Sequence, residues 1–327
     1  MGSGGGRRPP ARRRDRRLVS DAASDPARPN STRLAILIPF AIITLIWGST
    51  WLVITGQLGV VPPTWSVTYR FLTGGVAMLA WTAFSRQPLL LDRRGMAFSA
   101  LIGLMQFVLN FNFVYRAELH VTSGLVAVVF ALLLVPNALL SRIFLGQRMG
   151  GQLLLGSAVA MAGVALLFAH EIGRDPSVSG QVWLGIGLTL LGVCCASVAN
   201  VLQATETAKR YPMAPTIAWA MLAGAAMDGL YALATVGAPV FEWTPGYIAG
   251  VLYLGVVASA IAFPLYFGII RVIGPAKAAY SSVIIPVIAM LLSTLFEGYR
   301  WSPLAAAGAL LAGIGLVLAL RARRPNR

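Results

Sequence analysis

Apolar segments recur along almost the whole chain, each roughly 18–25 residues long and separated by short polar breaks. A helix of this length crosses a hydrocarbon core of about 30 Å, because each residue advances it by about 1.5 Å. The composition agrees: 57% of the residues are hydrophobic and only 11% are charged, too few to cover a soluble surface. The sequence therefore predicts an all-α integral membrane protein.

Ten such segments can be placed, five in each half of the chain. They cover residues 34–58, 64–84, 96–115, 122–145, 152–169, 180–203, 214–237, 246–270, 275–296 and 303–320. The segments are flanked by a basic N-terminal tail, residues 1–33, and a short basic C-terminal tail, residues 321–327. The N-terminal tail is rich in Gly, Pro and Ser and cannot bury a core, so we expect it to be disordered.

The basic residues fall on one side of this arrangement. With the N-terminus in the cytoplasm, 22 of the 26 Lys and Arg lie on cytoplasmic loops or tails and three lie outside. Cytoplasmic loops normally carry this excess. The sequence therefore predicts a multi-pass protein of the cytoplasmic membrane with both termini inside. The nine arginines of the first tail are interpreted as facing anionic lipid headgroups rather than nucleic acid.

The two halves also share glycines and prolines at a nearly constant separation. Two of the pairs that follow, the first two, are separated by 150 residues, and the other three are separated by 152. The pairs are Gly124/Gly274, Pro136/Pro286, Gly146/Gly298, Gly156/Gly308 and Gly163/Gly315. Because each half has an odd number of segments, the second copy would be inverted in the membrane, which is a recurring arrangement in transporters.

Longer motifs carry a family resemblance. The stretch "LIWGSTWLVITGQL" precedes "PPTWSVTYRFLTGG", and "VTSGLVAVVFALLLVPNALL" has a counterpart in "GPAKAAYSSVIIPVIAMLL". These resemble the EamA domain of the drug/metabolite transporter superfamily, with one repeat over residues 34–169 and another over 180–320. The resemblance implies solute transport by two inverted five-helix repeats. It also implies a central cavity formed by segments one, three, four, six, eight and nine.

The chain departs from that family at one loop position in each half. The family usually has Leu-Gly-Glu after the fourth helix of each repeat. Here the first copy has Gln147, and the second has Glu297 before Gly298. An electrostatic role assigned to that glutamate is therefore not expected to carry over to the first half.

Two ionisable side chains lie well inside predicted segments, Arg70 in the second and Asp228 in the seventh. Charges are costly in the membrane interior, so such residues are functional candidates by default. Three interpretations remain open: a structural role through polar neighbours, a mutual ion pair, or handling of a proton or substrate. The family's usual arginine at the position of Arg70 favours a structural role for it.

Uncharged polar and aromatic residues are the candidates for contact with substrate. Trp47 and Trp51 are four residues apart, as are Gln106 and Asn110, so each pair shares a helix face. The remaining candidates are Asn137, Asn200, Tyr266, Tyr280 and Ser281. Pro136 and Pro286 each remove a backbone donor in mid-segment and are expected helix breaks. Ordinary interhelical hydrogen bonding explains any one of these residues, whereas the set together predicts a polar cavity.

The sequence therefore predicts a secondary transporter that exports small organic metabolites, such as amino acids or related compounds, by alternating access. Nucleotide-binding, metal-ligand and catalytic motifs are not recognisable, so neither a cofactor nor a metal is expected. The alternatives are an integral-membrane enzyme, or a membrane sensor or scaffold that reuses a transporter fold. The expected partners are a small-molecule solute and the lipid bilayer, but no nucleic acid. A coupling proton is left open, as are the substrate, the direction of transport and the oligomeric state.

Overall fold

The structure is a computed structural model that describes residues 1–2, 28–146, 151–174, 179–279 and 285–320. All regular secondary structure in these ranges is helical. Most of both basic tails and the loop containing Gln147 lie outside them. Contacts divide the chain into two units, Met1–Ile38 and Pro39–Arg327, and the second unit holds the packed helices.

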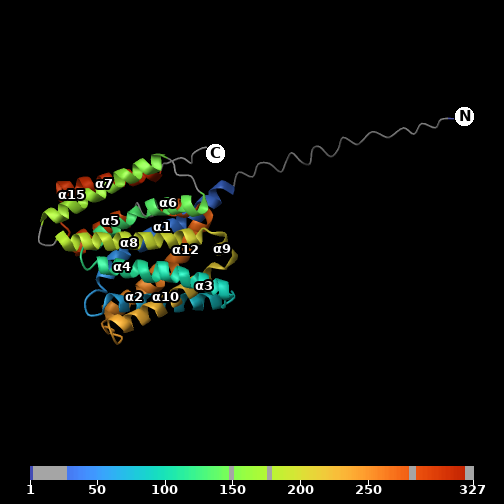
Figure 1. The fold of residues 1–327 in the computed structure, drawn as a ribbon, viewed down its shortest axis with the longest axis horizontal. Coiled ribbons are helices and arrows are strands. Elements are labelled where there is room, and N and C mark those ends of the chain that lie inside the picture. Colours follow the sequence, from blue (N-terminus) through green and yellow to red (C-terminus); the bar gives the residue numbers. More distant parts are fainter. Residues whose placement is uncertain (3–27, 147–150, 175–178, 280–284, 321–327) are drawn as a thin grey trace. The chain divides into compact units, whose positions relative to one another are not determined.

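The helices follow the predicted segments closely (Figure 1). In the first half they are α1 Arg28–Thr55, α2 Pro63–Phe84, α3 Arg93–Ile102, η1 Gly103–Leu109, α4 Asn110–Ala117, α5 Ser123–Phe130, η2 Ala131–Leu133, α6 Leu134–Leu145 and α7 Gly151–Arg174. In the second half they are α8 Ser179–Gln203, α9 Glu206–Arg210, α10 Met213–Thr235, α11 Pro245–Leu252, η4 Tyr253–Ile261, α12 Ala262–Ile273, α13 Pro275–Ala278, α14 Ile285–Phe296 and α15 Pro303–Leu320.

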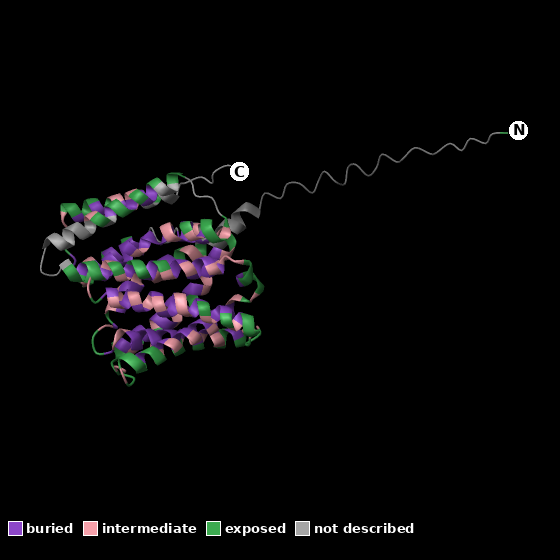
Figure 2. Ribbon diagram, in the orientation of Figure 1, coloured by how far each residue is buried: buried purple, intermediate pink, exposed green. Residues whose placement is uncertain are grey.

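Long apolar helices make this a membrane fold. Among the described residues, six helical runs are long and apolar enough to cross a membrane. Two shorter apolar helices, Ile285–Phe296 and Pro303–Gly315, accompany them. Figure 2 shows buried residues on the faces where helices meet and exposed residues on outward faces. Large apolar side chains such as Leu45, Trp81 and Leu230 are among the exposed ones, as expected where lipid replaces water.

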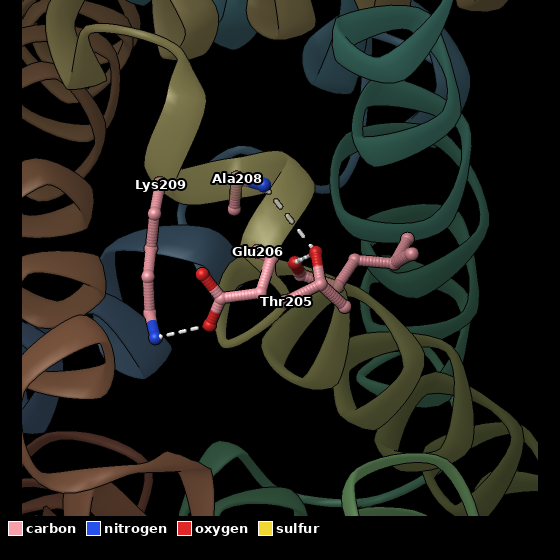
Figure 3. A network of polar contacts seen from close by, with 5 residues as sticks. Thr205, Glu206, Ala208 and Lys209 are labelled. Carbon is pink, nitrogen blue, oxygen red and sulfur yellow. Dashed lines mark hydrogen bonds and ion pairs between the residues drawn. The ribbon is translucent and has the colours of Figure 1, made fainter.

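The connection between α8 and α10 is built around the short helix α9 (Figure 3). The hydroxyl of Thr205 caps this helix by accepting a hydrogen bond from the backbone N–H of Ala208 at 3.3 Å. Lys209 and Glu206 form an exposed ion pair at 2.7 Å, which contributes at most about 1 kcal/mol. The cap and the ion pair therefore both stabilise this short helix.

The glycines that repeat in the sequence meet one another where α7 packs along α15. A Cβ added at Gly163 would lie 2.6 Å from the carbonyl oxygen of Gly308. A Cβ added at Gly315 would lie 2.6 Å from the carbonyl oxygen of Gly156. The contact is therefore reciprocal, as expected for two copies related by a two-fold axis. Close approach of the two backbones explains why small residues are needed at both positions.

The same reciprocity relates the contact of α2 with η4 to the contact of α10 with η1. A Cβ at Gly255 of η4 would lie 2.9 Å from the carbonyl oxygen of Arg70, and one at Gly103 of η1 would strike the carbonyl oxygen of Ala220. The glycines are 152 residues apart, and the two carbonyls belong to residues 150 apart. Arg70 and Ala220 therefore occupy equivalent places in the two repeats.

Both of these glycines lie in π-helical stretches, η1 in the first repeat and η4 in the second. A π-helix widens the helical turn and occurs frequently at functional sites. The backbone N–H of Asn110, for example, donates to the carbonyl of Met105, five residues earlier. Because each wider turn rotates the residues that follow it around the helix axis, these stretches help to set which side chains of α4 and α12 face the interior.

Candidate functional site

A cavity of about 80 Å³ lies inside the helix assembly. Its walls come from α1, η1, α4, α5, η2, α8 and α12, with Arg70 of α2 and Ile285 of α14. Apart from α2, these belong to the segments that the family resemblance implied. Six of the predicted substrate-binding residues line the cavity, namely Trp47, Trp51, Gln106, Asn110, Asn200 and Tyr266.

Two tryptophans of α1 form an aromatic wall. The Trp47 indole donates its Nε1–H to the carbonyl of Ala258 at 3.1 Å, which fixes the ring. Its centroid lies 4.9 Å from that of Tyr266 and 5.2 Å from that of Phe263. The centroid of the Trp51 ring lies 5.4 Å from that of Phe130, and the Trp51 Nε1 is buried without a hydrogen-bond partner in the part of the chain that the structure describes. This wall offers a large apolar surface and one unused donor.

The amides of Gln106 and Asn110 supply polar groups to another part of the wall. Asn110 donates from Nδ2 to the backbone carbonyl of Gln106 at 3.3 Å. The side-chain oxygens of both residues are buried and have no hydrogen-bond partner among the described residues. Unpaired buried acceptors are costly, so these oxygens are suited to a bound donor or to water.

A polar network closes one side of the cavity. Asn200 donates from Nδ2 to Oδ1 of Asn137 at 3.4 Å and to the hydroxyl of Tyr266 at 3.5 Å. Asn137 in turn donates to the carbonyl of Pro275 at 3.4 Å. Asn137 does not line the cavity, so it contacts the cavity residues from behind and links α6, α8 and α12 with the start of α13.

The other candidates lie elsewhere. Tyr280 and Ser281 fall outside the described residues. Pro286 lines a second cavity of about 340 Å³, bounded by α5, η2, α7, α14 and α15. Pro136 lies in α6 just after the 3₁₀ turn η2, where its missing N–H leaves the carbonyl of Leu132 without the usual helical donor. Neither proline lines the central cavity.

Arg70 is 1% exposed and lines the central cavity. Its Nε donates to the hydroxyl of Ser259 at 3.1 Å, and Nη1 to that of Tyr115 at 3.5 Å. Ser259 can accept because its own proton goes to the carbonyl of Leu254, five residues earlier in η4. The guanidinium also lies 4.3 Å from the centroid of the Phe111 ring, an interaction of about 0.5–2 kcal/mol.

Asp228 has partners of its own and does not pair with Arg70. The carboxyl accepts a hydrogen bond from Nδ2 of Asn112 at 2.7 Å, and its second oxygen is buried with no partner in the described ranges. Within the described residues, the ion pair within 4 Å is Lys209–Glu206. The structure therefore does not support a mutual pair of the two intramembrane charges. Asp228 links α10 to α4 away from the central cavity.

Sequence reasoning missed a pair of carboxyl groups at one end of the helices. Thr55 contacts Oε2 of Glu118 at 3.0 Å and Oε1 of Glu297 at 3.1 Å. Glu297 also accepts from the backbone N–H and the hydroxyl of Ser123, at 3.4 and 2.6 Å. It thus caps α5, where a negative charge is favourable. The two glutamates are 179 residues apart in the chain, so nothing in the local sequence indicates that they meet.

Burial favours a proton on Glu118, which lies just beyond the candidate span Arg93–Ala117. Burial raises the pKa of Glu118 well above its ordinary value, opposed by the Thr55 hydrogen bond, and the charge of Glu297 raises it further. One hydroxyl proton cannot bond both carboxylates. With a proton on Glu118, the carboxyl of Glu118 donates to the hydroxyl of Thr55, and that hydroxyl donates to the carboxylate of Glu297.

Comparisons with known proteins agree with the fold. The model of the EamA-like transporter family matches residues 34–169 and 180–321. The chain is 31% identical to YedA of Escherichia coli K12, an uncharacterized inner membrane transporter, over 78% of this chain and 80% of YedA. It is 24% identical to the protein PagO of Salmonella typhimurium, over 89% of this chain and 94% of PagO.

A solved crystal structure has the same fold. It superposes with a TM-score of 0.66 at 22% identity, covering 88% of this chain and 96% of its own. The predicted family is thus confirmed by a match to each half of the chain. This protein belongs to the EamA-like transporter family.

Proposed function

We propose that the protein is a secondary transporter that exports small organic solutes across the cytoplasmic membrane through the central cavity. The observation that carries this proposal is the cavity itself, whose wall combines α1, η1, α4 and α5 of the first repeat with α8 and α12 of the second. A site shared between repeats changes its access when the repeats move against each other. Its mixture of aromatic rings and a few convergent amides is typical of small-molecule sites.

The reciprocal glycine contacts support alternating access. The backbone of α2 meets η4 in the way that the backbone of α10 meets η1. Two copies with equivalent interfaces can exchange conformations, so that each end opens in turn. The family match and the transporter relatives favour this function over an integral-membrane enzyme or a sensor.

Filling the cavity tests the proposal. Ala127 of α5 is 1% exposed and lines the cavity. We expect Ala127→Leu, which adds three carbon atoms, to abolish transport while membrane abundance stays within about twofold, because the cavity accommodates part of the added volume. The measurement compares extracellular and intracellular metabolites of a deletion strain that expresses wild type or variant.

Ala306→Leu is the matched control, because Ala306 lies exposed on α15. The control should restore the wild-type metabolite profile. If Ala127→Leu also restored that profile at normal abundance, the central cavity would not be the transport route.

We also propose that the chain spans the membrane ten times, as repeats 34–169 and 180–320, with both termini cytoplasmic. In a background with Cys194 and Cys195 replaced by alanine, single cysteines at Arg86 and Arg174 should label from opposite sides. The reason is the excess of Lys and Arg on one set of loops. Labelling of intact cells with an impermeant maleimide measures this, and labelling of both positions from the same side would refute the ten-span arrangement.

A further inference from the structure

Arg70 places a positive charge in the wall of the central cavity. An arginine stays protonated in proteins, and this one is almost completely buried. Its hydrogen bonds within the described residues go to two neutral hydroxyls, those of Ser259 and Tyr115. None of the described residues that line the cavity is an aspartate or a glutamate. Glu118 influences Arg70 electrostatically but lies beyond ion-pair distance.

The repeat symmetry shows that this fold does not need a charge at such a place. The residue equivalent to Arg70 in the second repeat is Ala220, whose carbonyl meets Gly103 as that of Arg70 meets Gly255. Ala220 is completely buried among apolar neighbours. Close packing of α2 or α10 on a π-helical stretch is therefore achieved with or without the guanidinium. The guanidinium is present on one side alone and lies in the lining of the cavity, which favours a role there over the structural role that the family resemblance implied.

A buried charge without a counter-charge is unfavourable unless a ligand supplies one. Phe111 lies against one face of the guanidinium at 4.3 Å, which orients its plane. The remainder of the wall is aromatic or neutral, with Trp47, Trp51 and Phe263 in the same lining. An anionic group on an apolar body complements this distribution, whereas a cation would meet the charge of Arg70.

We propose that the transported solute carries a carboxylate, which binds the guanidinium of Arg70 while the apolar part of the solute packs against Trp47 and Trp51. This rests on the proposed transport function and specifies its substrate class. The cavity of about 80 Å³ is small beside ordinary ligand pockets of roughly 300–1,000 Å³. In this conformation it suits a small monocarboxylate rather than a dicarboxylate or a bulky drug.

Matched acids and amides test the proposal on the purified full chain in lipid nanodiscs. The probes are propanoate, 3-methylbutanoate and phenylacetate, each compared with its own carboxamide by calorimetric titration at about pH 7, where each acid is ionised. We expect at least one acid to bind roughly 10- to 100-fold more tightly than its amide, because a charge-assisted hydrogen bond is gained. Arg70→Gln should reduce that ratio to within about threefold, and Arg70→Lys should retain part of it, because the charge remains but the fork of donors is lost.

Arg116→Gln is the matched control, because Arg116 lies at the end of α4 beside Tyr231 and not in the cavity. It should leave the ratio unchanged. The acid-to-amide ratio of the wild type remains decisive even if Arg70→Gln fails to fold. Absence of any preference for an acid over its amide, or a preference that survives Arg70→Gln, would overturn the proposal. Amides that bind as well as acids, and lose binding in Ala127→Leu, would overturn it while leaving the transport function intact.

Discussion

Glu118→Gln is expected to make the protein more stable than the wild type at about pH 8 and equally stable below about pH 4. The carboxyl of Glu118 is buried, and its pKa is raised well above the ordinary value. In the unfolded chain it titrates near 4.3. Above that pH the folded protein still holds the proton that the unfolded chain has released. The stability that the protonated Glu118 contributes is therefore fully present below the unfolded pKa. It is lost as the pH rises through the pKa of the folded state.

Glutamine removes this loss because it keeps a neutral donor toward Thr55. Between the unfolded and the folded pKa of Glu118, the difference in the free energy of unfolding between variant and wild type should grow by at most about 1.4 kcal/mol for each pH unit. Thermal unfolding of the purified protein across that range of pH measures it. Glu206→Gln is the control, since Glu206 is exposed and pairs with Lys209 far from Thr55 in the chain. If the unfolding temperatures of wild type and Glu118→Gln changed with pH in parallel, Glu118 would be ionised over the whole range of pH.

Glu297→Gln should behave differently, although its carboxyl contacts the same Thr55 hydroxyl. Glu297 accepts two hydrogen bonds from Ser123 at the start of α5. Replacing this carboxylate removes a favourable charge at a helix N-terminus, and we expect a loss of about 0.5–2 kcal/mol. The two glutamines therefore distinguish a carboxyl that keeps its proton through burial from one that caps the N-terminus of a helix.

The fold could be predicted from the sequence because its main determinants are local or repeated. Segment length predicts helices that can cross a bilayer, and constant spacing of glycines predicts two copies. The structure gives the physical reason for that spacing, since Gly163 and Gly315 lie where the backbones of α7 and α15 approach closely. The left-handed backbone at Gly146 and Gly298, with φ of 65° and 69°, is likewise a repeated helix ending.

The site could be predicted only in part. Helix periodicity separates Asn110, which faces the cavity, from Asn112, which faces Asp228. The set of helices around the cavity came from the family resemblance and not from the residues themselves. The π-helical stretches have no sequence signature, although they determine where Ser259 meets Arg70. Contacts such as Glu118–Thr55–Glu297 depend on three distant segments and require the tertiary fold.

Asp228 provides the second large effect, through a matched series of substitutions. Asp228→Leu should lower membrane abundance and reduce stability by about 1–3 kcal/mol, because the amide of Asn112 loses its buried acceptor. Asp228→Asn should remain within about 1 kcal/mol of the wild type. A second carboxamide can still accept from Nδ2 of Asn112 through its own oxygen, and it buries no charge. Fluorescence-detected size exclusion and thermal unfolding of each variant measure both quantities.

The double variant Asp228→Leu/Asn112→Leu then decides why the single leucine fails. Removing both polar partners from an apolar interface costs little, so abundance should recover toward the wild-type level. If Asp228 acted together with the charge of Arg70, a second substitution at Arg70 would be needed to restore abundance. Arg70, however, lies against Ser259 and Tyr115 and not against Asp228. If Asp228→Asn kept normal abundance but made transport independent of pH, Asp228 would carry a coupling proton. Its carboxyl, oriented by the hydrogen bond from Asn112, would then be the group that takes up and releases that proton, rather than a structural link between α4 and α10.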